Sequence, residues 1–387
     1  MIPMKKYDVI IIGAGPAGSS AAYVLARSKI NVLVIDRYPF PRYKPCAGGL
    51  TVKTFKSFDF SIFKEVKYST NNVVASYKNK IFHNISGNKT LTKMVERKEF
   101  DNFLIKKAVD SGATFLDGMK VTEVVWENGE FSVKTEEQFF RCNYLIGADG
   151  TNSIVNRTFN IVERDLYGFA IEINCPLSKD NIGKFNMTFD FGTVPNGYLW
   201  IFPKDQYVCV GAYTTNRKMK NIQKYLFDYI ENLGLVPESK ELKGHIIPYY
   251  GIYYKQPDFP CILVGDAAGF GEYCTGEGIY YAVKSGTIAA EVISSSIKSE
   301  IFDYRTLQRR YQREIIRGLK LAYHIGKFFY GHLPLSFNLM MSYLPVSIMY
   351  ESASRGFTLD QSFSKIHVIL LSLILNKSHI SNNKYYK

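Results

Sequence analysis

Four runs of hydrophobic residues predict strands that are buried on both faces of a sheet. They lie at residues 7–12, 31–36, 142–148 and 260–264, and each ends at or leads into glycine or an acidic residue. A helical pattern of small residues follows the first run directly, from Ser19 onwards. Buried strands connected by helices form parallel sheets, so we expect an α/β domain of the Rossmann type.

A different pattern occupies the middle of the chain, where hydrophobic and polar residues alternate. The alternating segments are residues 169–173, 185–191, 197–203 and 207–213, with turns between them. Successive strands of this kind predict an antiparallel sheet. We expect this sheet to form a second domain of α+β character.

Helical patterns complete the expected architecture. Residues 96–111 place Phe100, Phe103, Leu104 and Ala108 on one face of an amphipathic helix. Further helices are expected at 218–235 and from about Ile279 to Ser296. The chain from Ile301 is expected to be mainly helical up to a polar tail that begins at Asn376 and favours disorder. The expected parts are a discontinuous nucleotide-binding domain (1–65, 91–160 and 255–300), a sheet domain (66–90 and 161–254) and a helical C-terminal region (301–387).

Composition narrows the class of protein. The 387 residues are 46% hydrophobic, as in ordinary globular chains, and carry a formal net charge of +13. This charge favours anionic partners such as phosphates, acidic lipid head groups or an acidic redox protein, although scattered lysines equally describe a solvated basic surface. We recognise no nucleic-acid-binding module and expect no nucleic acid partner. The 28 Tyr and 27 Phe residues suit aromatic-lined cavities or reflect a biased genome composition.

Cysteine usage and segment lengths suggest a location. Six cysteines are spread without a C-x-x-C pair or a His/Cys cluster, so we expect no metal site and a reducing, cytoplasmic environment. The first residues lead into a strand and show no signal peptide. No hydrophobic segment reaches the roughly 18 residues that span a bilayer. Residues 333–350 and 366–375 are candidate core helices or interfacial segments at the inner face of the cell membrane.

The first strand ends in a G-x-G-x-x-G turn, Gly13-Ala14-Gly15-Pro16-Ala17-Gly18. Gly13 can adopt a turn conformation closed to other residues, Gly15 lets a phosphate approach the backbone, and Gly18 allows close helix packing. Free N–H groups at the start of the helix then face a pyrophosphate, and Asp36 can accept from ribose hydroxyls. The motif predicts a dinucleotide site without distinguishing FAD from NAD. A glycine-rich turn in another α/β fold is the alternative.

Two later segments, Gly147-Ala148-Asp149-Gly150 and Gly265-Asp266-Ala267-Ala268-Gly269-Phe270, follow buried strands. With the first motif they resemble the FAD-binding signatures of the flavoproteins related to para-hydroxybenzoate hydroxylase. In that group the carboxylate of the third motif accepts from ribityl hydroxyls, and the next helix points N–H groups at phosphate and flavin. The resemblance implies FAD as the cofactor.

Within this group, two segments resemble the geranylgeranyl reductase family, which includes archaeal digeranylgeranylglycerophospholipid reductases. Pro45-Cys46-Ala47-Gly48-Gly49 is close to the family's P-C-A-G-G loop, and Tyr198-Leu199-Trp200-Ile201-Phe202-Pro203 matches its Y-x-W-x-F-P segment, which lines the substrate cavity. Arg97 matches an arginine that approaches the cofactor. Gly211 stands where the family has the first glycine of a G-x-G, but Tyr213 replaces the second, so the cavity should differ there.

The resemblance implies which residues form the site. The candidate catalytic residues are Cys46, Tyr198, Trp200, Phe202 and Cys274. The candidate cofactor-binding residues are Gly13, Ala14, Gly15, Pro16, Ala17, Gly18, Asp36, Arg37, Cys46, Ala47, Gly48, Arg97, Val121, Asp149, Gly265, Asp266, Gly276, Gly278 and Ile279. The six dispersed histidines are expected at surface or core positions.

Each chemical candidate has a plainer alternative. Cys46 is an inert loop residue or, beside two glycines and near basic residues, a thiol in a setting that favours the thiolate. If the family's fold brings Cys274 to the same face of the flavin, the two thiols can form a redox-active disulfide, provided that their Cα atoms come within about 7 Å. Alternation puts Tyr198, Trp200 and Phe202 on one face of a strand, as cavity wall or as ordinary core.

The resemblance implies an FAD-dependent reductase that saturates C=C bonds of geranylgeranyl or other isoprenoid chains in lipids or diphosphate precursors. Reduced flavin would deliver hydride to one alkene carbon, and an acid, with Cys46 as the candidate, would protonate the other. A dry cavity with aromatic faces suits the cation-like transition state. NADPH, reduced ferredoxin and a deazaflavin remain open as the electron donor. The substrate and the basic surface together suggest peripheral binding to a membrane surface.

Two alternatives are kept. Flavin-dependent monooxygenases and halogenases have the same fold, but halogenases carry a lysine-bearing tunnel and a W-x-W-x-I-P segment, and this chain has Tyr198 at the first tryptophan position. A non-catalytic flavoprotein that binds lipid or carries electrons is the second alternative.

Overall fold

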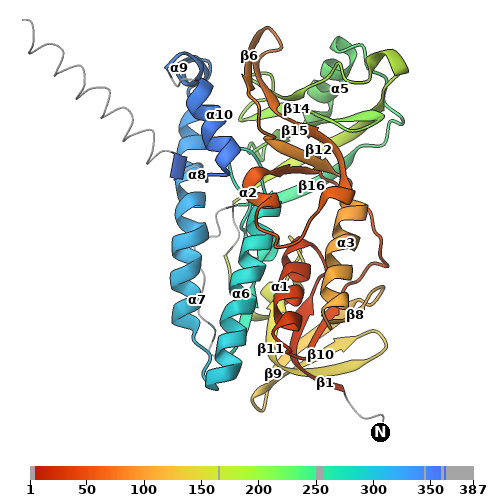
Figure 1. The fold of residues 1–387 in the computed structure, drawn as a ribbon, viewed down its shortest axis with the longest axis vertical. Helices are drawn as coiled ribbons and strands as arrows, with labels where there is room; N and C mark the ends of the chain where they lie inside the picture. The colour runs from red at the N-terminus through yellow and green to blue at the C-terminus, as the bar shows by residue number, and fades with distance from the viewer. Residues whose placement is uncertain are drawn as a thin grey trace, which may run out of the picture.

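The computed structural model describes residues 5–163, 166–249, 257, 259–343, 346–358 and 361–362. These residues form two large sheets at opposite ends of an elongated molecule, with a small sheet between them (Figure 1). The C-terminal helices form a column along one side that reaches from the first large sheet to the second.

The first sheet contains the strands predicted to be buried. Its order is β8-β2-β1-β11-β10-β9, and β17 also pairs with β11. Strand β1 is parallel to its neighbours β2 and β11, and β11 is parallel to β17, whereas β9, β10 and β11 are antiparallel. The bounds are β1 Lys5–Ile12, β2 Val32–Ile35, β8 Thr114–Leu116, β9 Val121–Glu127, β10 Glu130–Thr135, β11 Phe139–Gly147 and β17 Cys261–Leu263. The predicted Rossmann-type fold is confirmed.

Helices α1 (Pro16–Arg27) and α3 (Arg97–Asp110) contact strands of this sheet, and α6 (Ile279–Ser299) packs on α1. Helices α1 and α6 lie side by side (Figure 1). A Cβ atom at Gly286 of α6 would lie 2.2 Å from the carbonyl oxygen of Ala17, so the two backbones are in direct contact. This close approach fixes the start of α1, where the glycine-rich turn ends.

The second sheet has the order β16-β12-β15-β14-β13-β5-β6. All its pairs are antiparallel except β5 with β13, so the expectation of an antiparallel sheet holds except at that pair. The exception arises because β5 and β6 form an earlier hairpin, and the direction in which β5 meets β13 is not set by a turn between them. The bounds are β5 Asn72–Tyr77, β6 Ile81–Ser86, β12 Tyr167–Pro176, β13 Met187–Phe191, β14 Gly197–Pro203, β15 Tyr207–Thr214 and β16 Lys243–Pro248.

The two faces of β14 separate as alternation predicts. Tyr198, Trp200 and Phe202 belong to an aromatic core with residues of the C-terminal helices, whereas Leu199 and Ile201 pack in another core with helix α5 (Ile222–Asn232). All five side chains are buried. The aromatic face is the one that looks toward the nucleotide-binding part of the chain.

The small sheet, β3-β7-β4, joins the two ends of the molecule. Its strands are β3 (Gly49–Thr51), β4 (Val66–Thr70) and β7 (Thr92–Val95), and the short helix α2 (Val52–Phe55) follows β3. Because β7 runs directly into α3, the start of that helix lies beside the loop that precedes β3.

The C-terminal region is helical, as predicted, over the residues that the structure describes. Helices α7 (Tyr304–Tyr311) and α8 (Arg317–Gly331) join through a π-helical turn at 312–316, and α9 (Leu335–Tyr343) and α10 (Val346–Arg355) follow. The predicted polar tail lies outside the described residues. Within the described part of the chain, no helix combines the length and hydrophobicity needed to cross a membrane.

Candidate functional site

The glycine-rich turn between β1 and α1 leaves no room for side chains at two of its positions. Gly13 has a φ of +102°, and a Cβ atom there would lie 2.3 Å from the carbonyl oxygen of Ala148. A Cβ atom at Gly18 would lie 1.9 Å from the carbonyl oxygen of Gly13. A Cβ atom at Gly15 would lie 3.6 Å from Nη2 of Arg42, so this side of the turn faces a cation.

Asp36 stands at the end of β2 and is fixed against this turn. Its Oδ2 accepts a hydrogen bond from the N–H of Ala14 at 2.8 Å, and its Oδ1 accepts one from the N–H of Tyr38 at 3.0 Å. The side chain is buried, and each carboxylate oxygen retains a lone pair. The N–H of Met119 donates to the carbonyl oxygen of Asp36 at 2.9 Å. This hydrogen bond brings Val121, the first residue of β9, close to Asp36. The Arg37 guanidinium stacks instead on the exposed Tyr38 ring.

Two arginines converge on one buried carboxylate. Arg97 donates two hydrogen bonds of 2.8 Å to Asp101, which is 0% exposed. Nη1 of Arg42 lies 3.1 Å from Oδ2 of Asp101, but it is buried without a hydrogen bond of normal geometry among the described residues. Two cations thus share one anion, and a buried Arg42 nitrogen forms no hydrogen bond of normal geometry among the described residues. This arrangement suits an anionic group such as a pyrophosphate.

A third basic group lies near Asp266, the acid of the third glycine–acid motif. Nζ of Lys44 is 2.8 Å from Nε2 of His245. That histidine nitrogen is in turn 3.4 Å from Oδ2 of Asp266. Burial lowers the pKa of Lys44 to about 8. Burial favours the protonated form of Asp266, but the hydrogen bond and charge of His245, with the charge of Lys44, outweigh it and lower the pKa of that carboxyl.

The remaining predicted cofactor positions lie on the same side of the first sheet. Oδ2 of Asp149 accepts from the N–H of Ile154 at 2.6 Å, at the start of α4 (Ile154–Phe159), whereas its Oδ1 is buried without a partner among the described residues. Burial raises the pKa of Asp149. Gly265 has a φ of +57°, and a Cβ atom at Gly278, next to Ile279, would lie 3.6 Å from Oδ1 of Asp266.

These residues fit FAD. The turn at Gly13 accepts only glycine, and Asp36 has lone pairs for a ribose. The Arg42 nitrogen without a hydrogen bond and the excess positive charge suit a pyrophosphate. The orphaned oxygen of Asp149 indicates a further polar partner at the same place.

The loop that carries Cys46 lies against the sheet domain. The N–H of Cys46 donates to Oε1 of Glu172 at 2.8 Å, and the N–H of Gly48 approaches the Cys46 sulfur at 3.4 Å. Although burial disfavours its charge, Asp101 and the Cys46 sulfur together raise the pKa of Arg97. The Cys46 sulfur therefore lies beside a permanent cation and a backbone N–H.

An aromatic wall formed by Tyr198, Trp200 and Phe202 stands opposite this loop. The centroids of Tyr198 and Trp200 are 6.0 Å apart, and those of Trp200 and Phe202 are 6.4 Å apart. A Cβ atom at Gly49 would lie 2.6 Å from the Phe202 ring, so the glycines of the loop let it pack directly on the wall. Nε1 of Trp200 is buried without a hydrogen bond of normal geometry among the described residues.

Tyr213, which replaces a glycine expected from the family resemblance, fills space at one end of this wall. It is fully buried, with its ring centroid 5.3 Å from that of Tyr198, and its hydroxyl donates to the carbonyl oxygen of Tyr273 at 2.9 Å. The predicted difference in cavity shape therefore takes the form of an additional aromatic ring.

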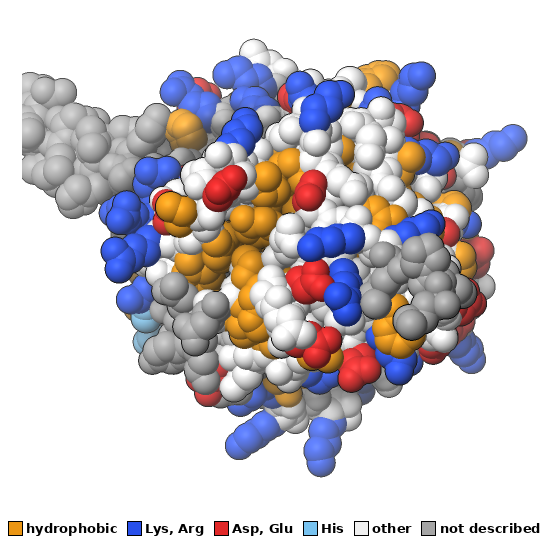
Figure 2. Space-filling view, turned by 90° about the horizontal axis from the view of Figure 1, so that it is seen from below, with side chains coloured by type: hydrophobic (Ala, Val, Ile, Leu, Met, Phe, Trp, Pro, Cys, Tyr) orange, Lys and Arg blue, Asp and Glu red, His pale blue; other side chains and the backbone are white. Residues whose placement is uncertain are grey.

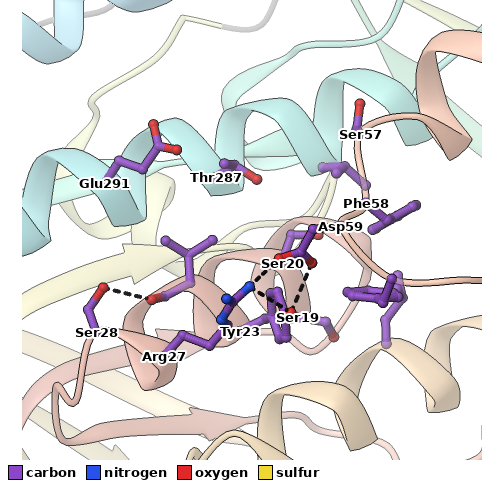
Figure 3. A pocket seen from close by; sticks show the side chains of 14 residues that line it. Ser19, Ser20, Tyr23, Arg27, Ser28, Ser57, Phe58, Asp59, Thr287 and Glu291 are labelled. Atoms are coloured by element: carbon purple, nitrogen blue, oxygen red, sulfur yellow. Dashed lines mark hydrogen bonds and ion pairs between the residues drawn. The ribbon is translucent and has the colours of Figure 1, made fainter.

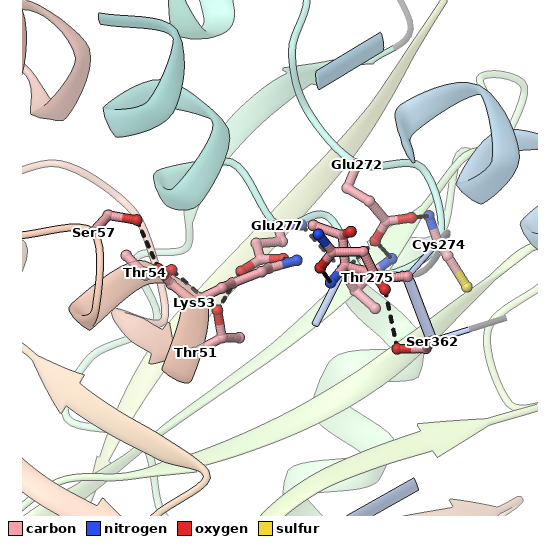
Figure 4. A network of polar contacts seen from close by, with 11 residues as sticks. Thr51, Lys53, Thr54, Ser57, Glu272, Cys274, Thr275, Glu277 and Ser362 are labelled. Atoms are coloured by element: carbon pink, nitrogen blue, oxygen red, sulfur yellow. Dashed lines mark hydrogen bonds and ion pairs between the residues drawn. The ribbon is translucent and has the colours of Figure 1, made fainter. Parts of the chain in front are cut away.

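Cys274 lies in a turn beside Glu272 and Thr275 (Figure 4). Its N–H donates to Oε1 of the buried Glu272 at 2.7 Å, and the hydroxyl of Tyr330 donates to its carbonyl oxygen. A Cβ atom at the nearby Gly276 would lie 3.5 Å from the hydroxyl oxygen of Tyr198. Cys46 and Cys274 are both free thiols in the structure, and their pairing remains a hypothesis.

A separate cavity of about 480 Å³ lies between α1, α6 and residues 57–60 (Figure 3). It is lined by hydroxyl groups, aromatic rings and the Arg27–Asp59 ion pair. None of its lining residues belongs to the glycine-rich turn or to residues 265–278, so this cavity is distinct from the site described above.

Sequence reasoning missed five polar residues of this site: Arg42, Lys44 as a partner of His245, Asp101, Glu172 and His245, the last having been expected at the surface or in the core. Glu172 is the one with a visible signal, because it interrupts a strand that is otherwise uncharged from Phe169 to Cys175. The others lie in a loop, on a helix and on an edge strand, where charged residues are ordinary.

Comparisons with known proteins agree with this geometry. Residues 6–171 match the family described as FAD binding domain. An uncharacterized protein from Methanosarcina barkeri is 87% identical over 387 residues, which is 100% of both chains. The digeranylgeranylglycerophospholipid reductase of Methanocaldococcus jannaschii is 31% identical over 339 residues, 79% of this chain and 81% of that protein. The geranylgeranyl diphosphate reductase of Rhodobacter capsulatus is 30% identical over 308 residues, 76% of each chain.

Solved structures share the fold. A geranylgeranyl bacteriochlorophyll reductase-like protein from Thermoplasma acidophilum has a TM-score of 0.78 at 20% identity, with 94% of this chain and 99% of that chain covered. A flavin-dependent brominase has a TM-score of 0.68 at 17% identity, with coverage of 91% and 93%. At such identities these structures confirm the fold and leave the chemistry to the residues of the site.

Proposed function

Since this chain belongs to the geranylgeranyl reductase family, we propose that it is an FAD-dependent reductase that saturates C=C bonds in the isoprenoid chains of lipids or their diphosphate precursors. One observation carries the proposal to this site: the Cys46 loop packs on the aromatic wall at Phe202, beside the Arg97 guanidinium. A proton donor, a cation and an apolar wall thus meet where the cofactor cradle opens.

The cofactor-binding role of the residues named from the sequence is part of this proposal. The turn Gly13–Gly18 with Arg42 and Arg97 would hold the pyrophosphate, Asp36 the adenosine ribose, and Asp266 the ribityl chain. When bound, FAD supplies the hydride chemistry that no side chain can perform.

The residues of the chain supply the proton and the environment. The Cys46 thiol would give its proton to one alkene carbon, and the resulting thiolate would be stabilised by Arg97 and by the N–H of Gly48. The faces of Tyr198 and Trp200 would exclude water and stabilise positive charge that develops on the alkene. The protein therefore protonates a substrate that has no polar group at the reacting bond.

Binding to a membrane surface is the remaining part of the proposal. The net charge of +13 and the exposed hydrophobic side chains of the C-terminal helices, Phe328, Leu335 and Leu339, support peripheral binding to acidic lipid, from which an isoprenoid chain can be taken. Figure 2 shows the molecule from below the view of Figure 1, with a band of hydrophobic side chains and both basic and acidic side chains around it. An acidic redox protein is the corresponding proposal for the electron donor, with NADPH or a deazaflavin as the alternatives.

The test is anaerobic. FAD-loaded protein is reduced chemically and mixed with a geranylgeranyl lipid, and oxidation of the flavin is followed by its visible absorbance while the lipid is analysed by mass spectrometry. Lipid-dependent oxidation with gain of hydrogen by the lipid supports the reductase. Flavin that stays reduced while the lipid is unchanged contradicts it and favours a non-catalytic flavoprotein.

A halogenase is the second candidate, because a buried lysine lies beside the Cys46 loop. Lys204 is 6% exposed and follows the aromatic wall, but its Nζ donates to the carbonyl oxygen of Val95 at 2.6 Å and faces Glu96. A lysine held in this way is structural rather than poised in a tunnel. Oxygen uptake that depends on substrate, with or without halide, would decide for a halogenase or monooxygenase.

A further inference from the structure

Glu172 is a charged residue on the aromatic face of the second sheet. In the sheet register it lies opposite Gly211, and Gly211 lies opposite Trp200. Residues directly opposite one another in adjacent antiparallel strands point to the same face. The Glu172 side chain therefore shares the face of Trp200, with only a glycine between them.

The carboxyl group of Glu172 connects this face to the Cys46 loop. Its Oε1 accepts from the N–H of Cys46 at 2.8 Å and from the hydroxyl of Tyr43 at 3.3 Å. Its Oε2 accepts from the thiol of Cys209, on β15, at 3.7 Å. Glu172 is 7% exposed, so these donors replace water. A single side chain thus fixes both ends of the segment 43–46 on the sheet.

The pKa of Glu172 is raised, although its neighbours oppose the shift. Burial raises the pKa of this carboxyl, and the hydrogen bond from Cys46, the charge of Lys204 and the hydrogen bonds from Tyr43 and Cys209 oppose it. An ionised carboxylate accepts from all three donors, whereas protonation turns one oxygen into a donor and removes the charge that strengthens the hydrogen bonds to the other. Protonation at acidic pH would therefore weaken the attachment of the loop.

We propose that Glu172 is a positioning residue for alkene reduction, whose ionised carboxylate holds the Cys46 backbone against the aromatic wall and whose protonation releases it. The inference rests on the proposed function for its catalytic consequence, since Cys46 is the proposed proton donor. The attachment of the loop itself can be measured without that activity.

The experiment compares FAD-loaded wild-type protein with Glu172→Gln, Glu172→Asp and Tyr43→Phe. Gln keeps the size of Glu172 but cannot be ionised, Asp keeps the charge, and Phe removes one donor to the same oxygen without touching the N–H of Cys46. The first readout is the limiting rate at which Cys46 is alkylated at high pH, with Cys274 in the same digest as the internal reference. At this limit the rate reports accessibility rather than the fraction of thiolate.

We expect Glu172→Gln to raise this limiting rate about tenfold or more, because a buried donor loses an ionised acceptor. Glu172→Asp should raise it less, and so should Tyr43→Phe, which removes one attachment but keeps the hydrogen bond from the N–H of Cys46. In the reductase assay, the acidic limb of the kcat profile should be present in wild type and in Glu172→Asp and absent in Glu172→Gln, while KM for the lipid changes little. Equal Cys46 alkylation in wild type and Glu172→Gln overturns the proposal.

Two outcomes are separated by this design. If the wild-type protein reduces no lipid, the proposed function fails, and the alkylation rates still decide whether Glu172 holds the loop. If Glu172→Gln does not retain FAD, the alkylation experiment is replaced by hydrogen exchange of the intact wild-type protein. The exchange is then followed in the digest peptide that contains Cys46. Protection of the Cys46 amide that is lost at acidic pH, after correction for the intrinsic rate, supports the proposal, and protection independent of pH contradicts it.

Discussion

The indole of Trp200 lies directly over Gly211: a Cβ atom at Gly211 would come within 2.1 Å of Cζ2 of the ring. Trp200 is 5% exposed and surrounded by other aromatic rings, so it has little room to move away. The glycine on β15 therefore sets the position of the aromatic wall.

Gly211→Ala should accordingly displace the indole. We expect a loss of about 1–3 kcal/mol in the free energy of unfolding, the usual cost of overpacking, and slower lipid reduction. FAD content should stay normal, because neither residue belongs to the cofactor cradle. Gly244→Ala on the edge strand β16 is the control, since its Cβ atom would meet nothing closer than 3.5 Å. Denaturant unfolding and flavin absorbance check both variants, and equal stability of the two would contradict the prediction.

Replacement of Cys46 tests its proposed role as proton donor. Cys46→Ala should leave FAD bound and slow alkene reduction by about 10²-fold or more, the usual contribution of a general acid. Cys46→Ser retains a poor acid and should be slow as well. Cys209→Ser serves as a control for a nearby buried thiol. Single-turnover oxidation of reduced flavin by lipid measures the effect, and unchanged turnover in Cys46→Ala would remove this thiol from the mechanism.

The affinity for FAD should depend on pH through Lys44. Burial lowers the pKa of this amine to about 8, so in the free protein it is charged below that pH and neutral above it. An anionic ligand favours the charged form, and affinity should therefore fall as pH rises through about 8. Lys44→Arg should abolish the decrease and Lys44→Met should weaken binding at lower pH. Titration of the apoprotein with FAD across this range provides the measurement.

Arg42 should contribute to FAD binding more than an arginine in a similar ion pair at the surface. Its side chain is 11% exposed and its Nη1 lacks a hydrogen bond of normal geometry, whereas Arg27 is 56% exposed and pairs with Asp59. Arg42→Gln should weaken FAD binding about tenfold or more, because a charge-assisted contact with phosphate is lost. Arg27→Gln should have no effect on affinity. Similar losses in both variants would indicate a general effect of positive charge.

Binding to membranes should depend on salt. With a net charge of +13, the protein should sediment with vesicles that contain an acidic phospholipid and much less with neutral vesicles. Raising the ionic strength from low to about 1 M should release most of it, because exposed charges are then screened. Equal binding to both kinds of vesicle would assign the attachment to hydrophobic side chains instead.

Much of this site could be predicted from local sequence. The three glycine–acid motifs follow buried strands, and Asp36 reaches the N–H of Ala14 within a single strand–helix–strand unit. The alternation of β14 also fixed which side chains form the aromatic wall, because the period of a strand decides the face. Such features need only short-range geometry.

Contacts between distant segments could not be predicted in this way. Glu172 meets Cys46 across 126 positions, His245 meets Asp266 and Lys44 from an edge strand, and Asp101 joins Arg42 from a helix. A charged residue in any of these elements is most often a solvated surface group, and its burial depends on what packs over it. The sequence by itself thus determined the fold, the cofactor and the family resemblance, since these depend on motifs with fixed spacing. Only the tertiary structure decided which charges surround the Cys46 thiol, because the sheet and the loop that carry them meet only when the chain is folded.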